Sequence, residues 1–231
     1  MTTTLITGAN KGVGREAARR LLADGHDVWI AARDSDRGQA TANELDARFV
    51  ALDVTDEDSV RAAAARVASQ TATLDVLINN AGITGAHKPP AEVDGEDLRT
   101  VFDTNVFGIA RVTRAFLPLL ERLQNPVIVN VSSGMGSLAV TTDPARFEST
   151  LIGLAYPASK AALNMLTTQY AKAFPNIRVN AVDPGYTSTG LNQHRGTKTV
   201  QQGAEAIVAM AKIDGAGPTG TFVDEHGTVP W

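Results

Sequence analysis

Short runs of apolar, mostly β-branched residues recur along the chain and alternate with longer alanine-rich segments of helical spacing. Most runs are apolar at consecutive rather than alternate positions, which is typical of strands covered on both faces. Helices that cross over between parallel strands provide such coverage, so the pattern predicts a doubly wound parallel α/β sheet of about seven strands with helices on both faces. The expected strands are Thr3–Thr7, Asp27–Ala31, Arg48–Leu52, Asp75–Ile78, Val127–Val131, Arg178–Val182 and Gly220–Val223.

Two of the helical segments carry recognisable start signals. Thr55 stands before the acidic residues 56–58 and is expected to cap a helix, because an N-cap oxygen and first-turn carboxylates both stabilise a helix N-terminus. Thr199 followed by Gln202 predicts a capping box at a second helix. The stretches 134–154 and 185–198 lack clear periodicity and follow expected strands, where ligands bind in sheets of this kind.

The composition excludes several kinds of chemistry. The 231 residues include no cysteine, which excludes disulfides, thiolate catalysis, zinc–thiolate sites and iron–sulfur clusters. The histidines (His26, His87, His194 and His226) have no metal-ligand spacing, so no metal site is expected. The net charge of -4 gives no general attraction to nucleic acid or anionic lipid. With no apolar run near the ~20 residues that cross a bilayer and no signal-peptide pattern, we expect a cytoplasmic protein without nucleic-acid or membrane partners.

A glycine-rich turn follows the first expected strand and opens a helix. Gly8 permits a sharp turn, Gly12 lets the backbone approach a pyrophosphate, and Gly14 allows the helix to pack closely on the strand. The amides and the dipole of such a helix N-terminus attract an anionic pyrophosphate. The Gly-x-x-x-Gly-x-Gly spacing differs from the common dinucleotide fingerprint and from the P-loop. A turn without ligand is therefore the alternative to a Rossmann-type dinucleotide site.

The end of the second expected strand indicates which dinucleotide would bind. Ala32 offers no carboxylate to a ribose 2′-hydroxyl, whereas Arg33 can form charge-assisted hydrogen bonds with a 2′-phosphate. Lys11, in the glycine-rich turn, is expected on the same side. These two cations favour NADP(H) over NAD(H). Asp34 is the one residue that favours NAD(H) instead, since its carboxylate would hold the ribose 2′-hydroxyl if it turned inward.

Tyr156 and Lys160 lie four residues apart in a helical segment and therefore share one face. A free tyrosine has a pKa of ~10. A nearby ammonium group, together with an oxidised nicotinamide, would stabilise the phenolate and lower that pKa, so that the phenol serves as acid toward a carbonyl or as base toward an alcohol. The hydroxyl of Ser133, at the end of the fifth expected strand, can hold the carbonyl oxygen and stabilise developing charge.

With these residues the sequence resembles the short-chain dehydrogenase/reductase family and, more narrowly, its carbonyl-reductase-like, NADPH-dependent branch. The resemblance extends over nearly the whole chain, so residues 1–231 are expected to form a single dinucleotide-binding catalytic domain. The matching motifs are Thr7 through Gly14, Asp53-Val54, Asn79-Asn80-Ala81-Gly82, Asn105-Val106-Phe107-Gly108, Ser132-Ser133, Tyr156 through Lys160 and Pro184-Gly185.

The resemblance implies four catalytic residues. Ser133 would orient the substrate oxygen, and Tyr156 would transfer the proton. Lys160 would hold the nicotinamide ribose and lower the tyrosine pKa, while Asn105 would help to seat a water linked to Lys160. Ser133 is preferred to Ser132 because the serine of this family is usually the second of such a pair.

The resemblance also implies the residues that hold NADP(H). Asp53 and Val54 would border the adenine, and residues 80–82 would line the cofactor channel. Pro184 and Gly185 would lie against the nicotinamide, with Thr187 near its carboxamide, while Lys11 and Arg33 match the family's 2′-phosphate ligands. The full expected set is Gly8, Asn10, Lys11, Gly12, Val13, Gly14, Arg33, Asp53, Val54, Asn80, Ala81, Gly82, Tyr156, Lys160, Pro184, Gly185 and Thr187.

The interval between Ser133 and Tyr156 is longer than is usual in the family. Carbonyl-reductase-like members carry a longer insertion here, which caps the site and can block the usual tetramer interface. The insertion in this chain is of intermediate length, so monomer, homodimer and homotetramer all stay open.

The leading interpretation is an NADP(H)-dependent oxidoreductase that reduces a ketone or aldehyde, or catalyses the reverse oxidation. A non-catalytic NADP-binding redox sensor on the same fold is the alternative, and the presence of all four catalytic residues favours the enzyme. Epimerases and dehydratases with the same tyrosine generally add a C-terminal substrate domain, for which 231 residues leave no room. The substrate is expected to be small or medium-sized and hydrophobic, because the loops that follow the strands offer Met135, Leu138, Ile152, Tyr186 and Leu191.

Overall fold

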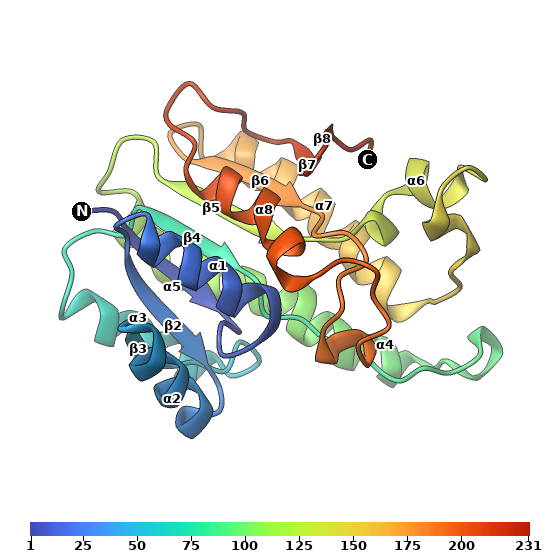
Figure 1. Cartoon of the computed structure of the whole chain (residues 1–231), viewed down its shortest axis with the longest axis horizontal. Helices are drawn as coiled ribbons and strands as arrows, with labels where there is room; N and C mark the ends of the chain where they lie inside the picture. The colour runs from blue at the N-terminus through green and yellow to red at the C-terminus, as the bar shows by residue number, and fades with distance from the viewer.

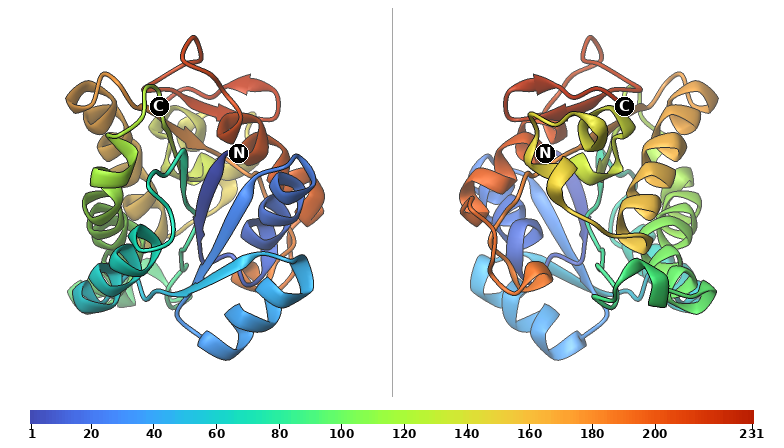
Figure 2. Two further views of the ribbon diagram at one scale, coloured as in Figure 1. Left: turned by 90° about the vertical axis from the view of Figure 1, so that its left-hand side faces the viewer. Right: turned by 90° about the vertical axis from the view of Figure 1, so that its right-hand side faces the viewer.

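A computed structural model describes residues 1–231 and contains a single sheet with helices on both faces (Figures 1 and 2). The strand order is β3-β2-β1-β4-β5-β6-β7-β8. Neighbouring strands pair in parallel from β3 through β7, and β8 pairs with β7 in antiparallel orientation. The strands are β1 (Thr3–Thr7), β2 (Asp27–Ala32), β3 (Arg48–Ala51), β4 (Val76–Asn79), β5 (Val127–Val131), β6 (Arg178–Val182), β7 (Phe222–Asp224) and β8 (Gly227–Thr228).

This topology confirms the predicted doubly wound α/β architecture and adds one strand to the expected seven. The order runs outward from β1 to β3 and then resumes on the other side of β1 with β4. The strand order therefore reverses between β1 and β4, the type of position where such sheets bind ligands. The additional β8 has two residues and closes a hairpin whose turn amides, His226 N and Gly227 N, both donate to Asp224 Oδ1.

The helices form two layers that bury both faces of the sheet. Helices α1, α2 and α8 cover one face, and α3, α5 and α7 cover the other (Figure 2). Each face has its own apolar core, one around Ile6, Ile78 and Val129, the other around Leu5, Leu77 and Phe116. The helices are α1 (Gly12–Ala23), α2 (Ser35–Leu45), α3 (Glu57–Ala68), α4 (Gly95–Phe102), α5 (Gly108–Leu120), α6 (Leu138–Thr142), α7 (Ala155–Ala173) and α8 (Val200–Ala211).

One of the two predicted helix starts is confirmed and the other is displaced by a residue. Thr199 and Gln202 form the expected capping box of α8. Helix α3 is capped by Asp56, whose side chain accepts from Asp58 N, and Thr55 instead bonds to Asp53 Oδ1. None of the helices has the length and apolar character needed to span a membrane.

Short helical turns replace regular periodicity in the stretch between β5 and α7. They are η3 (Gly134–Gly136), α6 and η4 (Phe147–Thr150). The C-terminal residues pack against this stretch, because Ser137 Oγ donates to the carbonyl of Pro230 at 2.6 Å and the rings of Phe222 and Trp231 stack. Because Trp231 packs on Phe222 of β7, this stretch is held at one end of the sheet.

The core of the α3–α5 layer supplies a stability prediction. Phe116 on α5 is fully buried, and its replacement by alanine removes apolar contacts and leaves a cavity. We expect Phe116→Ala to lower the free energy of unfolding by about 3 to 5 kcal/mol in denaturant titrations. Phe107→Ala is the matched control, because that ring is 48% exposed and its loss is expected to cost far less. Equal losses for the two variants would contradict this description of the core.

Candidate active site

Two adjoining cavities form one cleft along the carboxyl ends of the parallel strands. The first has a volume of about 350 Å³ and is surrounded by segments that follow β4, β5 and β6. The second, of about 800 Å³, extends over the turns that follow β1, β2, β3 and β4. The two cavities share six lining residues, namely Val13, Asn80, Gly82, Thr84, Thr189 and Leu191.

The glycine-rich turn lies in the second cavity and leaves its floor free of side chains. Gly8 has a φ of +65°, and a Cβ at this position would lie 3.0 Å from the Cα of Ala81. Asn80 holds the two turns together, because its amide donates to the carbonyl of Thr7 at 2.8 Å. A Cβ at Gly14 would lie 2.3 Å from the same amide nitrogen. The absence of Cβ atoms leaves room for a pyrophosphate against the backbone, so this groove fits a dinucleotide.

Three cations line the part of this groove near the ends of β1 and β2. Lys11 and Arg33 are exposed and form no ion pair with the protein. Arg37, which the sequence analysis missed, also lines the groove from the first turn of α2. Asp34 caps α2 by accepting from Arg37 N at 2.9 Å and pairs with the Arg37 guanidinium at 2.6 Å. The carboxylate of Asp34 is thereby engaged with its own helix.

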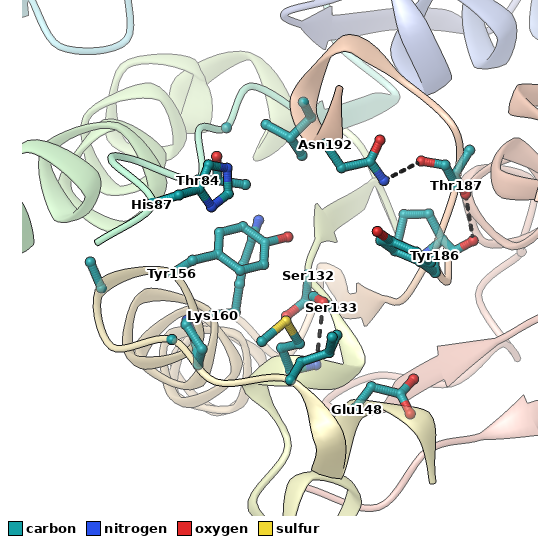
Figure 3. A pocket seen from close by; sticks show the side chains of 18 of the residues that line it. Thr84, His87, Ser132, Ser133, Glu148, Tyr156, Lys160, Tyr186, Thr187 and Asn192 are labelled. Carbon is teal, nitrogen blue, oxygen red and sulfur yellow. Dashed lines mark hydrogen bonds between the residues drawn. The ribbon is translucent and has the colours of Figure 1, made fainter. Parts of the chain in front are cut away.

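Tyr156 and Lys160 extend from the first turns of α7 into the first cavity, facing Tyr186 and Thr187 (Figure 3). Lys160 is 4% exposed, and its Nζ donates to the carbonyl of Val131 at 2.7 Å. The same nitrogen lies 5.6 Å from the centroid of the Tyr156 ring. The predicted sharing of one helix face therefore brings both side chains to the end of β5.

In the protein alone, the pKa of Tyr156 lies above the ordinary value of a tyrosine. Burial raises it to about 12, and the nearby charge of Asp183 acts in the same direction, while a hydrogen bond with the Ser133 hydroxyl opposes both. Burial also lowers the pKa of Lys160 to about 8, against the effect of Asp183. The predicted lowering requires an oxidised nicotinamide beside the phenol and therefore stays a prediction; in the protein alone the cost of desolvating a phenolate dominates.

The two neighbouring serines have different surroundings. The hydroxyl of Ser132 is buried and donates to Asn164 Oδ1 at 2.6 Å, which ties β5 to α7. Ser133 is partly exposed to the first cavity, where its hydroxyl accepts from Met135 N at 3.2 Å and lies close enough to Tyr156 to lower the pKa of that phenol. Ser133 is therefore the serine whose hydroxyl faces the cavity.

Asn105 lies beneath the cleft rather than in its wall. It is fully buried in a π-helical turn, η2 (Asp103–Phe107), and its amide exchanges two hydrogen bonds with the backbone of Ile83. The same amide donates to Ser159 Oγ on α7 at 3.0 Å. A Cβ at Gly82 would lie 3.4 Å from Asn105 Oδ1 and 3.7 Å from Lys160 Nζ. The side chain therefore joins the β4 turn to α7 close to the lysine.

The structure brings together nearly all of the predicted site residues. Each of the expected cofactor residues lines at least one of the two cavities, and so do three of the four expected catalytic residues. Asn105 is the exception, for the reason just given. No cluster of three or more His, Asp or Glu side chains has the arrangement of a metal site.

Apolar side chains form part of the wall of the first cavity, beside polar and charged ones. The rings of Phe147 and Tyr186 lie 5.5 Å apart and form one wall. Of the apolar loop residues named from the sequence, only Leu138 lies outside the cavity lining, because it begins α6 and is 74% exposed. The apolar lining residues that were not expected from the sequence include Phe147, Leu151 and Leu154.

A glycine-rich first turn at a reversal of strand order, with a tyrosine–lysine pair beside it, defines the class: an α/β oxidoreductase that uses a nicotinamide dinucleotide. The family model described as short chain dehydrogenase matches residues 2–199. A short-chain dehydrogenase of Penicillium roqueforti is 35% identical over 97% of this chain and 94% of its own length. The (-)-isopiperitenone reductase of Mentha piperita is 32% identical over 94% of each chain.

Among solved structures, the NADPH-bound carbonyl reductase from chicken fatty liver has a TM-score of 0.89 at 28% identity, covering 100% of this chain and 99% of that one. The chain belongs to the short-chain dehydrogenase/reductase family. The resemblance stated from the motifs is thereby confirmed at the level of the family.

The packing of α7 on the turn after β5 supplies a prediction. A Cβ at Gly136 would lie 2.6 Å from the carbonyl carbon of Lys160, a backbone atom that cannot move without displacing α7. We expect Gly136→Ala to lower the free energy of unfolding by about 1 to 3 kcal/mol and turnover by about tenfold or more, measured by denaturant titration and steady-state kinetics. Gly95→Ala is the control, because a Cβ there meets no atom within 4 Å. Wild-type turnover in Gly136→Ala would show that the position of α7 is not critical.

Proposed function

We propose that the protein is an NADP(H)-dependent carbonyl reductase in which Tyr156 is the acid and base of the reaction. The observation that supports this best is the Tyr156–Lys160 pair beside the hydroxyl of Ser133, in a cleft continuous with a dinucleotide-sized groove. When bound, NADPH would supply the hydride. The remaining tasks, which are to orient the carbonyl, donate a proton and exclude water, fall to residues of this chain.

Tyr156 is the proposed proton donor. With a pKa of about 12, its phenol is fully protonated at neutral pH, the form required to donate to a carbonyl oxygen as negative charge develops there. The Ser133 hydroxyl is the proposed second hydrogen-bond donor to the same oxygen. Two donors on one oxygen stabilise the alkoxide-like transition state more than the neutral carbonyl, and this difference accelerates the reaction.

Lys160 is proposed to stay charged below its pKa of about 8 and to hold the nicotinamide ribose. Its ammonium group also favours the phenolate form of Tyr156 after proton donation, because the two side chains are adjacent in a region with little water. Asn105 is proposed to hold the β4 turn against α7, so that Lys160 stays at the end of β5.

NADP(H) is the proposed cofactor, supported by the cations of the second cavity. Arg33 and Lys11 have no carboxylate partner within the protein and are free to bind a 2′-phosphate. Asp34, the one acidic group at the tip of β2, is engaged with Arg37. The NADPH-bound state of the chicken carbonyl reductase structure is consistent with the same assignment here.

A hydrophobic ketone or aldehyde is the proposed substrate. Phe147, Tyr186 and Leu191 line the outer cavity, and apolar walls bind by removing apolar surface from water. The 350 Å³ volume accommodates a molecule of small or medium size.

The function is tested first by replacing the proposed acid. The wild-type protein is expected to oxidise NADPH in the presence of members of a panel of apolar ketones and aldehydes. Tyr156→Phe is expected to lose turnover by about 10²- to 10⁴-fold, the usual contribution of a general acid. NADPH binding, measured by fluorescence, is expected to be nearly unchanged, because the ring is retained.

Tyr170→Phe is the matched control, since Tyr170 lies on the same helix but lines neither cavity. Substantial turnover in Tyr156→Phe would contradict the proposed acid. A wild-type protein that binds NADPH tightly and reduces nothing on the panel would favour the redox-sensor alternative instead.

Cofactor choice is tested at the 2′-phosphate. Loss of a charge-assisted hydrogen bond costs about 1.5 to 3 kcal/mol, so Arg33→Ala should raise the KM for NADPH by about 10- to 100-fold. The KM for NADH should change little, because NADH lacks this phosphate. Steady-state kinetics with both cofactors measures this, with Arg66→Ala as control, since Arg66 is exposed on α3 and lines neither cavity. Equal increases for both cofactors would remove Arg33 from the phosphate site.

A further inference from the structure

Asp183 is a buried carboxyl group at the end of β6 that none of the predicted roles includes. It is 5% exposed and lines the first cavity. Its Oδ1 accepts from the amide of Gly185 at 2.8 Å, and the Gly134 backbone lies close enough to this carboxylate to lower its pKa. One side chain thus contacts the turn after β5 and the turn after β6. These turns carry Ser133 and Pro184, respectively.

The packing around the carboxylate leaves little freedom for either turn. A Cβ at Gly134 would lie 3.0 Å from Asp183 Oδ2 and equally 3.0 Å from Glu148 Oε1. Gly185 has a φ of +70°, a backbone conformation that the hydrogen bond from its amide helps to hold. The hydroxyl of Ser133, one residue before Gly134, therefore depends on Asp183 for its position.

The charged groups that face Asp183 come from three other elements. Lys160 lies on α7 beside Tyr156, Glu148 lies on η4, and Lys198 lies in the segment before α8. Glu148 pairs with Arg146 at 3.5 Å and Lys198 with Glu225 at 3.0 Å. Lys160 and Asp183 have no ion-pair partner within 4 Å. Lys160 and Asp183 are therefore two opposite charges buried in one cleft. Desolvating a buried charge costs free energy unless an opposite charge compensates it.

We infer that Asp183 is a positioning residue of the reaction: its carboxylate holds the Ser133 turn against the Pro184–Gly185 turn and supplies the negative charge that keeps Lys160 an ammonium ion. The inference rests on the proposed proton transfer by Tyr156. It adds to that proposal a fifth side chain, which acts through Ser133 and Lys160.

Removal of this charge has a defined sign. Asp183 raises the pKa of Lys160 and that of Tyr156, so a neutral residue at this position lowers both values. Carbonyl reduction requires the protonated forms of both groups. The alkaline limb of the kcat profile for reduction must then move to lower pH. Burial and Glu148 raise the pKa of Asp183 itself, whereas the two amides and Lys198 lower it, so the effect is sought from neutral pH upward.

The test compares Asp183→Asn, which removes the charge at nearly constant shape, with Asp183→Glu, which keeps it. We expect the alkaline limb of kcat to move down by about 1 pH unit in Asp183→Asn, the size of effect that one nearby charge produces. Asp183→Glu should retain the wild-type limb position, even where its maximal rate is lower. Asp24→Asn is the charge-matched control, since Asp24 pairs with Lys212 at the end of α1 and lies outside both cavities.

Thermal unfolding and NADPH fluorescence titration check that each variant is folded and binds the cofactor. Asp183→Ser is a second neutral variant, and its hydroxyl can still accept from Gly185 N. An unshifted limb in folded Asp183→Asn would overturn the inference, and so would equal shifts in the Asn and Glu variants. Failure of both neutral variants to fold would assign Asp183 to folding alone and also overturn it. A wild-type protein without any carbonyl turnover would count against the proposed function itself, which keeps the two failures distinct.

Discussion

The hydrogen bond from Lys160 Nζ to the carbonyl of Val131 is the contact on which the rest of the site depends, because it joins α7 to the end of β5 at the floor of the cleft. Two further contacts hold the same junction, namely Ser132 to Asn164 and Asn105 to Ser159. Gly136 permits the close approach, since any Cβ there would meet the Lys160 backbone. The position of Tyr156, one turn earlier on α7, follows from this junction.

The cleft divides into two halves of different chemistry. The half over β1 to β3 has bare backbone and unpaired cations, which suits a large anionic ligand. The half beyond β5 and β6 has aromatic and aliphatic walls, with the few buried polar groups gathered at its inner end. A molecule that enters this half therefore exchanges water for apolar contacts along the aromatic and aliphatic walls and meets polar groups at Tyr156 and Ser133. A lone carbonyl on an apolar frame satisfies this arrangement, whereas a substrate with several charges does not.

The fold was predictable because its strongest sequence signals come from burial. Strands covered on both faces must be apolar at consecutive positions, so β1, β5 and β6 were located with their correct ends. Strand β8 was missed because its two residues are exposed and carry no periodicity. Thr55 was predicted to cap α3, but Asp56 does so. Both residue types are good N-caps, and only the path of the chain after β3 selects between them.

The parts of the candidate site that depend on short sequence patterns were predictable, whereas those that depend on contacts between distant segments were not. The Tyr156–Lys160 spacing and the glycine-rich turn are local patterns, and the structure brings them to one cleft. The importance of Asp183 depends on two turns that are distant in sequence, and the engagement of Asp34 depends on a residue of the following helix. The raised pKa of Tyr156 in the protein alone is another such effect, because a spacing rule records a charged neighbour but not the water that folding removes.

Burial also bears on the proton transfer that is proposed for Tyr156. The protein alone holds Tyr156 as a neutral phenol and weakens the charged form of Lys160, so the resting site is prepared to donate a proton rather than to accept one. Oxidation of an alcohol would begin with the phenolate, a form that burial and the charge of Asp183 both oppose. An added positive charge in the cleft, such as an oxidised nicotinamide ring, would oppose that effect. The protonation state of the protein alone therefore suits proton donation by Tyr156, the step that the proposed carbonyl reduction requires.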